Sequence, residues 1–109
     1  MTINDIKQCI IERSYEFSIH AQQERLEDDL DITDIEAAIM NGEVLENYPD
    51  DPRGESCLLL GYVRENPLHI VVGWSRMKFG DKKALRIITV YVPQPPKWRT
   101  PRRRGGNEQ

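Results

Sequence analysis

Cysteine is scarce in this 109-residue chain, and no apolar run approaches the roughly 20 residues that a membrane-spanning helix needs. Cys9 and Cys57 allow at most one disulfide, and their spacing matches no zinc ligand set. The N-terminus lacks the basic and then apolar layout of a signal peptide. These absences predict a soluble, cytoplasmic protein. The length predicts one domain, with a single core that needs no disulfide or metal to support it.

Motifs for metals and cofactors are also missing. His20 and Glu24 stand four residues apart, which places both on one helix face, but no second close-spaced pair completes a zinc site with them. There is no Walker-type phosphate loop. Cys57 opens an apolar segment, which predicts a buried, inert thiol rather than a nucleophile. We therefore expect a protein that uses neither a metal nor a cofactor.

Charge is distributed unevenly along the chain, although its formal net value is only -3. Residues 1–66 carry 5 Lys/Arg and 16 Asp/Glu, a net of -11, whereas residues 67–109 carry 10 Lys/Arg and 2 Asp/Glu, a net of +8. A basic second half can present a positive surface to phosphates while the acidic half stays solvated. The alternative is an ordinary soluble surface with a mobile basic end.

Three amphipathic segments near the N-terminus predict helices, because apolar residues recur there at helical spacing. Residues that cap helix starts stand before or at the start of each segment. These are Asn4 or Asp5 for the first, Ser18 for the second, and a capping box of Thr33 and Glu36 for the third. The helices are expected over residues 3–14, residues 20–30 and a short stretch that ends at Asn41-Gly42.

Four apolar segments follow, separated by short polar connections. They predict strands over residues 44–48, 57–62, 68–74 and 84–92, arranged as an antiparallel meander. Because the helices precede the strands, the fold class is α+β, with N-terminal helices packed on a four-stranded, mostly antiparallel sheet. Prolines after Val92 stop the last strand, so residues 1–99 form the domain and residues 100–109 are expected to be a basic, disordered tail.

The strands carry several reactive side chains. His69 shares a strand face with Val71, opposite Leu68, Ile70 and Val72. If that apolar face packs under the helices together with Ile88 and Val90, then His69, Thr89 and Tyr91 emerge on the open face of the sheet. In that arrangement Arg86 has to reach the open face from an edge.

Short segments of the chain, taken together, resemble a bacterial family of unknown function that is related to the messenger-RNA-cleaving toxins RelE and MqsR. The resemblance covers roughly residues 15–99. It rests on FSIHA at 17–21, IEAAI at 35–39, GEVLENYP at 42–49, SCLLLG at 56–61, LHIV at 68–71, and IITVYVP at 87–93 through Trp98.

This resemblance implies a RelE-like domain whose sheet cradles RNA, and a metal-independent cleavage in which the 2′-hydroxyl attacks the adjacent phosphate. Such a reaction needs a base, an acid and a cation, which His20, His69 and Arg86 can supply. Tyr91 or Thr89 would donate hydrogen bonds. Which histidine is the acid and which is the base stays open.

Substrate contacts and a partner are expected as well. Thr89, Arg25, Lys83 and Arg99 are the expected RNA-binding residues. The commoner family pattern has an arginine four residues after the helix histidine, whereas this chain has Glu24 there and Arg25 next. A neighbouring antitoxin is also implied, in this group often a zinc-containing, MqsA-like protein.

Two other functions remain open at this stage. The basic half can bind RNA or an acidic protein without cleaving anything, or the histidines can be structural residues of a regulatory protein. The positions of three side chains in space discriminate among the three candidate functions. Convergence of His20, His69 and Arg86 in one cleft favours an enzyme, and dispersal favours a binding module or a regulatory protein.

Overall fold

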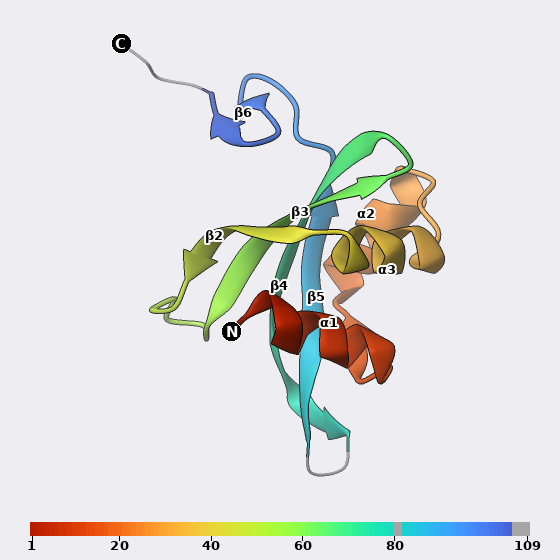
Figure 1. Cartoon of the computed structure of the whole chain (residues 1–109), viewed down its shortest axis with the longest axis vertical. Coiled ribbons are helices and arrows are strands. Elements are labelled where there is room, and N and C mark those ends of the chain that lie inside the picture. The colour runs from red at the N-terminus through yellow and green to blue at the C-terminus, as the bar shows by residue number, and fades with distance from the viewer. Residues whose placement is uncertain (80–81, 106–109) are drawn as a thin grey trace.

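In the computed structural model, which describes residues 1–79 and 82–105, three helices cover one face of a five-stranded sheet (Figure 1). The opposite face, here called the open face, carries no helix. None of the described helices is long and apolar enough to cross a membrane. The helices are α1 (Ile3–Ile11), α2 (Ile19–Glu27) and α3 (Ile32–Met40).

The three predicted helices are present, but two of the three caps differ from the prediction. Ser18 caps α2 as expected, because its hydroxyl accepts a hydrogen bond from the Ala21 amide at 2.9 Å. For α1 the cap is Thr2 rather than Asn4 or Asp5. For α3 a capping box of Asp31 with Asp34 replaces the predicted pair of Thr33 and Glu36, so the helix begins slightly earlier.

The sheet is mixed and has one strand more than predicted. Its order is β1-β5-β4-β3-β2, and every neighbouring pair is antiparallel except β1 with β5. The extra strand has only three residues and is held by pairing with a distant segment. The strands are β1 (Tyr15–Phe17), β2 (Glu43–Tyr48), β3 (Ser56–Val63), β4 (Asn66–Phe79) and β5 (Lys82–Tyr91). Gly80 and Asp81, in the predicted link between the last two strands, lie outside the described residues.

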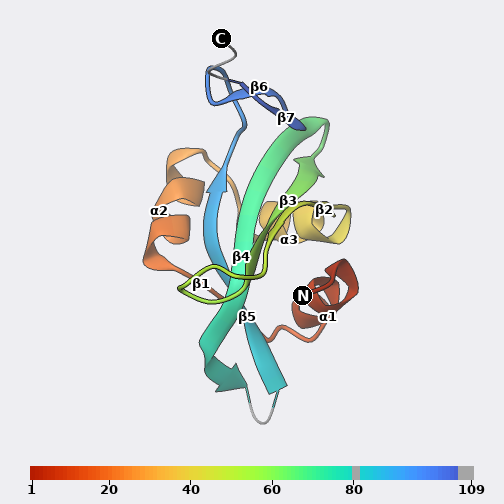
Figure 2. The ribbon, with the colours of Figure 1, turned by 90° about the vertical axis from the view of Figure 1, so that its left-hand side faces the viewer.

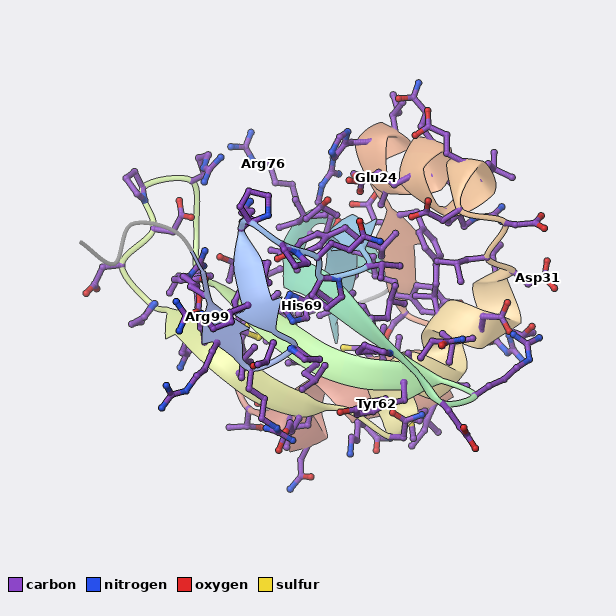
Figure 3. All side chains as sticks on the ribbon, turned by 90° about the horizontal axis from the view of Figure 1, so that it is seen from above. Glu24, Asp31, Tyr62, His69, Arg76 and Arg99 are labelled. Atoms are coloured by element: carbon purple, nitrogen blue, oxygen red, sulfur yellow. The ribbon has the colours of Figure 1, made fainter. Side chains whose placement is uncertain are left out.

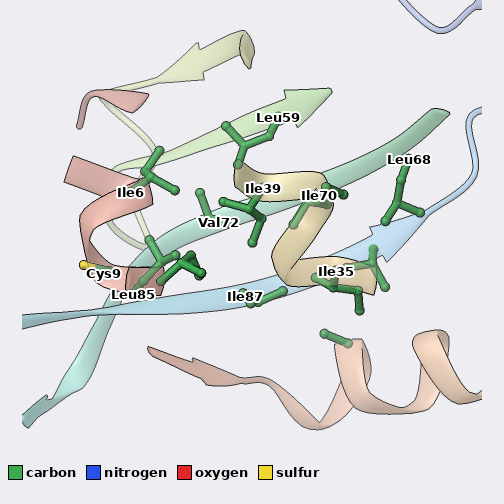
Figure 4. Packing of buried hydrophobic residues seen from close by; sticks show 14 of the residues in the cluster. Ile6, Cys9, Ile35, Ile39, Leu59, Leu68, Ile70, Val72, Leu85 and Ile87 are labelled. Carbon is green, nitrogen blue, oxygen red and sulfur yellow. The ribbon is translucent and has the colours of Figure 1, made fainter. Parts of the chain in front are cut away.

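The main core lies between the helices and the sheet (Figure 4). Ile6 of α1 and Ile39 of α3 pack toward apolar residues of β3, β4 and β5, all of them buried. Helix α3 approaches β3 so closely that a Cβ atom at Gly61 would lie 2.0 Å from the carbonyl oxygen of Ala38. A glycine is therefore required at this contact.

A β-bulge in β5 changes which of its residues face the core. Val71 pairs with Thr89 but Val72 pairs with Ile87, which leaves Ile88 as the extra residue. Ile87 and Val90 are therefore both in the core. The expectation that Ile88 packs under the helices is wrong: it lines the open face instead, and so does Arg86.

The chain after β5 forms a second, two-stranded sheet of β6 (Trp98–Thr100) and β7 (Arg103–Arg104), called here the C-terminal hairpin. It lies at the end of the main sheet where β5 finishes (Figure 2). Residues 100–105 were predicted to belong to the disordered tail; in the structure they lie in and beside this hairpin, which Trp98, only 1% exposed, anchors. The rest of that predicted tail, residues 106–109, lies outside the described part of the chain.

Candidate functional site

His69 lies on the open face of the sheet but is covered completely, with 0% of its surface exposed. Its Nε2 is 2.7 Å from the carbonyl oxygen of Pro101 in the C-terminal hairpin, and its Nδ1 is 3.1 Å from the Tyr91 hydroxyl. Because a carbonyl only accepts, Nε2 carries the hydrogen and Nδ1 accepts from Tyr91. A neutral imidazole thus has both nitrogens satisfied.

Aromatic rings enclose this histidine on two sides. The ring centroids of Tyr91 and Trp98 lie 5.1 Å and 4.4 Å from that of His69, both in edge-on geometry. Burial lowers the pKa of His69, and the Pro101 carbonyl and the charge of Glu46 only partly oppose that effect. His69, labelled in Figure 3, therefore lies beneath the hairpin rather than in an accessible cleft.

Ion pairs attach the hairpin to β2. The Arg104 guanidinium donates to both carboxylate oxygens of Glu46, at 2.7 and 3.1 Å, and to the Tyr48 hydroxyl at 3.3 Å. It also stacks on the Trp98 ring, 4.6 Å from the centroid. Arg104 holds the pKa of Glu46 below its usual value. A second pair joins Arg102 to Glu43.

His20 lies at a different place, on the first turn of α2, and its side chain is 68% exposed. Its Nε2 is 3.1 Å from Oε2 of Glu24. The other carboxylate oxygen accepts from the Thr89 hydroxyl at 2.6 Å and from the Val90 amide at 2.8 Å. Strand β1 ends before it reaches this part of β5, so Glu24 satisfies an edge amide that would otherwise lack a strand partner.

Arg86 belongs to a third location. It forms an ion pair with Glu16 at 3.2 Å, and Ser75 donates to the same carboxylate. Arg86 is opposite Gly73, whereas Tyr91 is opposite His69, so the two positions are separated by four residues of β4, about 13 Å along the sheet. The predicted convergence of His20, His69 and Arg86 in one cleft is therefore absent; the structure brings together His69 with Tyr91, and His20 with Thr89 through Glu24.

The remaining predicted substrate contacts are dispersed. Arg25 donates to Gln22 at 2.6 Å and to the Leu30 carbonyl at 3.1 Å, which ties down the end of α2. Lys83 lies over the Trp74 ring, 5.0 Å from its centroid. Arg99 is exposed on β6.

A groove of about 590 Å³ lies on the open face and contains Arg86; it is called here the open-face groove. Its walls come from β1, from the loop between β2 and β3, and from β4. It combines cationic and aromatic side chains with carboxylates over a floor of small and apolar residues. The arginines are Arg53, Arg76 and Arg86, the rings are Tyr48 and Trp74, and the carboxylates are Glu16, Asp51 and Glu55.

Most charges in this groove have a fixed partner. Arg53 pairs with Asp51 at 3.2 Å, and the terminal ammonium of Met1 pairs with Glu55 and lowers the pKa of that carboxyl. Arg76, labelled in Figure 3, is exposed at the rim. Sequence reasoning named Arg86 of this groove but missed its other charged residues, because they come from β1, from a loop and from beyond the predicted end of a strand. Arg86 itself and the positive charge of the second half of the chain were the signals that pointed to it.

The chain has side chains of the types that bind a metal, and it has two free thiols. In the described part of the chain, no three His, Cys, Asp or Glu side chains are grouped so that they could hold a metal ion. Cys57 is fully buried, and burial raises the pKa of its thiol to about 11. Such a thiol stays protonated and unreactive near neutral pH.

Comparison with known proteins identifies one family. The sequence model of a domain of unknown function, DUF4258, matches residues 17–92, from the end of β1 to just past β5. The matched segment contains both histidines and most of the lining of the open-face groove. No curated protein and no solved structure matches the chain.

Proposed function

The chain belongs to the DUF4258 family of domains of unknown function, and we propose that it binds single-stranded RNA along the open face of its sheet. The observation that carries this proposal is the composition of the open-face groove, in which three arginines and two aromatic rings line one hollow. Proteins that bind single strands combine cations that follow the phosphates with rings on which bases stack. A cytoplasmic location, where RNA is available, is part of the proposal.

The existing ion pairs in the groove are compatible with phosphate binding. Arg86 uses Nη1 for Glu16, and a guanidinium has five N–H donors in all. Glu16 thus orients Arg86, and Asp51 orients Arg53. Each guanidinium still has N–H donors that can bind an anion. Orienting a long side chain before binding reduces the entropy that binding costs.

The C-terminal hairpin extends the basic surface beyond the groove. Tyr48 lines the groove and also receives a hydrogen bond from Arg104, so the groove and the hairpin are adjacent. Five cations stand in the eight residues from Lys97 to Arg104. RNA that leaves the groove past Tyr48 would meet them.

Anisotropy of a fluorescein-labelled 15-nucleotide uridine RNA tests the proposal. Arg76→Gln removes one cation from the groove rim, and Arg64→Gln removes an exposed cation from the β3–β4 turn, outside the groove. We expect only Arg76→Gln to weaken binding, and to reduce the slope of log K against log salt by about 0.7, the value for one phosphate contact on a single strand. Equal effects of the two variants would contradict a groove-bound RNA.

RNA cleavage by a RelE- or MqsR-like toxin is a second function that we propose, and one observation favours it. His20 is exposed, and Glu24, itself held by Thr89 and the Val90 amide, fixes one of its ring nitrogens. A histidine oriented by a carboxylate is a common general base. It would take the proton of a 2′-hydroxyl as that oxygen attacks phosphorus, and the leaving 5′-oxygen would take a proton from solvent water.

The catalytic proposal changes the role of His69. Both of its nitrogens are engaged and none of its surface is exposed, so we assign it to structural support. The toxin proposal also includes a cognate antitoxin, of the MqsA-like kind, whose co-expression would suppress growth arrest. Neither cleavage nor the antitoxin is needed for the RNA-binding proposal.

A further inference from the structure

A second hollow, of about 360 Å³, lies on the helical side of the molecule, away from the open face. It is called here the α1–α3 groove. Its apolar lining includes Ile11 from α1 and both Ala37 and Met40 from α3. Arg13 and Glu36 stand at its polar rim, 3.9 Å apart.

The apolar residues in this groove are left over from the core. Helix α1 buries Ile6, Cys9 and Ile10, and Ile11 falls one position beyond that stripe. Helix α3 buries Ile35, Ala38 and Ile39, and Met40 again falls one position beyond it. Ile11 is consequently 61% exposed and Met40 38% exposed. Ile11 and Met40 are thus apolar residues that the core does not use, and they meet in one hollow.

The charge around this hollow restricts what can occupy it. Residues 3–14 and 31–41, which carry the two helices that form the groove, hold five Asp/Glu and two Lys/Arg, a net of -3. An acidic surface repels a polyanion and attracts a cationic partner. RNA is therefore unsuited to this face, and a basic protein segment is favoured.

We propose that the α1–α3 groove is a docking site for a basic amphipathic helix of another protein. A hollow between two helices with an apolar floor and a polar rim receives apolar side chains that stand one turn apart on a third helix. Lysines or arginines on the flanks of that helix would meet the surrounding carboxylates. Because the groove lies on the other side of the sheet from the open-face groove, RNA and this partner can bind together.

The experiment uses the full chain, labelled with ¹⁵N, and two 14-residue peptides as probes. One peptide places leucines on one face of a helix and lysines elsewhere, and the other replaces each lysine with glutamate. We expect the lysine peptide to shift the amide signals of Ile11, Ala37 and Met40, and the glutamate peptide to leave them unchanged. RNA anisotropy measured without peptide, and amide shifts measured without RNA, separate this proposal from the RNA-binding one, since each can fail alone.

Two variants provide a matched comparison. Met40→Lys places a charge in the groove, and Leu26→Lys places one on the exposed part of α2, where Leu26 is 65% exposed and outside the groove lining. Met40→Lys should weaken binding of the lysine peptide at least tenfold, and Leu26→Lys should weaken it less than twofold. If Met40→Lys does not fold, Ile11→Lys replaces it. Equal binding of both peptides, or equal weakening by both variants, would overturn the proposal. A dimer of the chain that Met40→Lys dissociates would also overturn it, because a second copy would then be the occupant.

Discussion

The indole of Trp98 packs edge-on against the imidazole of His69, with ring centroids 4.4 Å apart and planes at 87°. This contact joins the C-terminal hairpin to the first part of β4. Both rings are buried, and so are Leu58 and Leu60, which are 1% exposed and lie on the strand beside β4. The protein thus has a small second core on the open face of its sheet, and His69 is its polar centre.

The first prediction concerns that second core. Trp98→Ala should lower the free energy of unfolding by about 3–5 kcal/mol, because it removes the largest side chain there and leaves a cavity over His69. Urea denaturation followed by circular dichroism measures the change. Trp98→Phe, which keeps an aromatic ring, should lower the free energy of unfolding clearly less. Equal stability of Trp98→Ala and the parent protein would show that the hairpin contributes nothing to the fold.

The second prediction is a pH dependence of stability. Burial holds the pKa of His69 below 6.5, whereas in the unfolded chain the same group titrates at about 6.5. As the pH falls, the unfolded chain therefore binds a proton on His69 before the folded chain does. The contribution of His69 to stability is complete above pH 6.5 and is lost as the pH falls toward the lower pKa of the folded state.

Thermal unfolding between pH 7.5 and 5.5 checks this dependence, because the carboxyl groups titrate below this pH range. His69→Gln can still donate to Pro101 and accept from Tyr91 but does not titrate, so its stability should fall less over this range. Parallel pH curves for the two proteins would argue against His69 as the source.

The third prediction concerns the contact between α3 and β3. Gly61→Ala would place a Cβ atom 2.0 Å from the Ala38 carbonyl oxygen, which is backbone and cannot rotate away. We expect a loss of at least about 1–3 kcal/mol, the range for overpacked cores. Gly73→Ala is the comparison, because its nearest neighbour is the end of the Ile88 side chain at 3.1 Å. A larger loss for Gly73→Ala would be inconsistent with this packing.

The fourth prediction tests cleavage. If the domain cleaves RNA, His20→Ala should lower the rate by about 10²–10⁴-fold, the usual contribution of a general acid or base. The melting temperature should hardly change, since the side chain is 68% exposed. His69→Gln should keep the cleavage rate within a few-fold of the parent protein.

Chelation provides an independent check on the same reaction. Cleavage should survive an excess of EDTA, since the proposed chemistry uses side chains alone. Loss of activity in EDTA that returns with added metal would overturn this mechanism. Unchanged cleavage by His20→Ala would remove His20 from it.

Local features of this protein were readable from the sequence. Ser18 caps α2 as its side chain predicts, and Leu68, Ile70 and Val72 face the helices while His69 faces the other way. Cys57 is buried, as the apolar segment around it indicates. Each of these depends on neighbours within a few residues, through capping or through the two-residue period of a strand.

Tertiary structure alone decided how those pieces meet. The parallel pairing of β1 with β5, the bulge at Ile88 and the contact of Trp98 with His69 all join segments that are distant in the chain. The bulge turned Ile87 inward, and the hairpin covered a histidine that the strand pattern placed on an open surface. Periodicity determines which face a residue occupies, but only long-range packing determines what then covers that face.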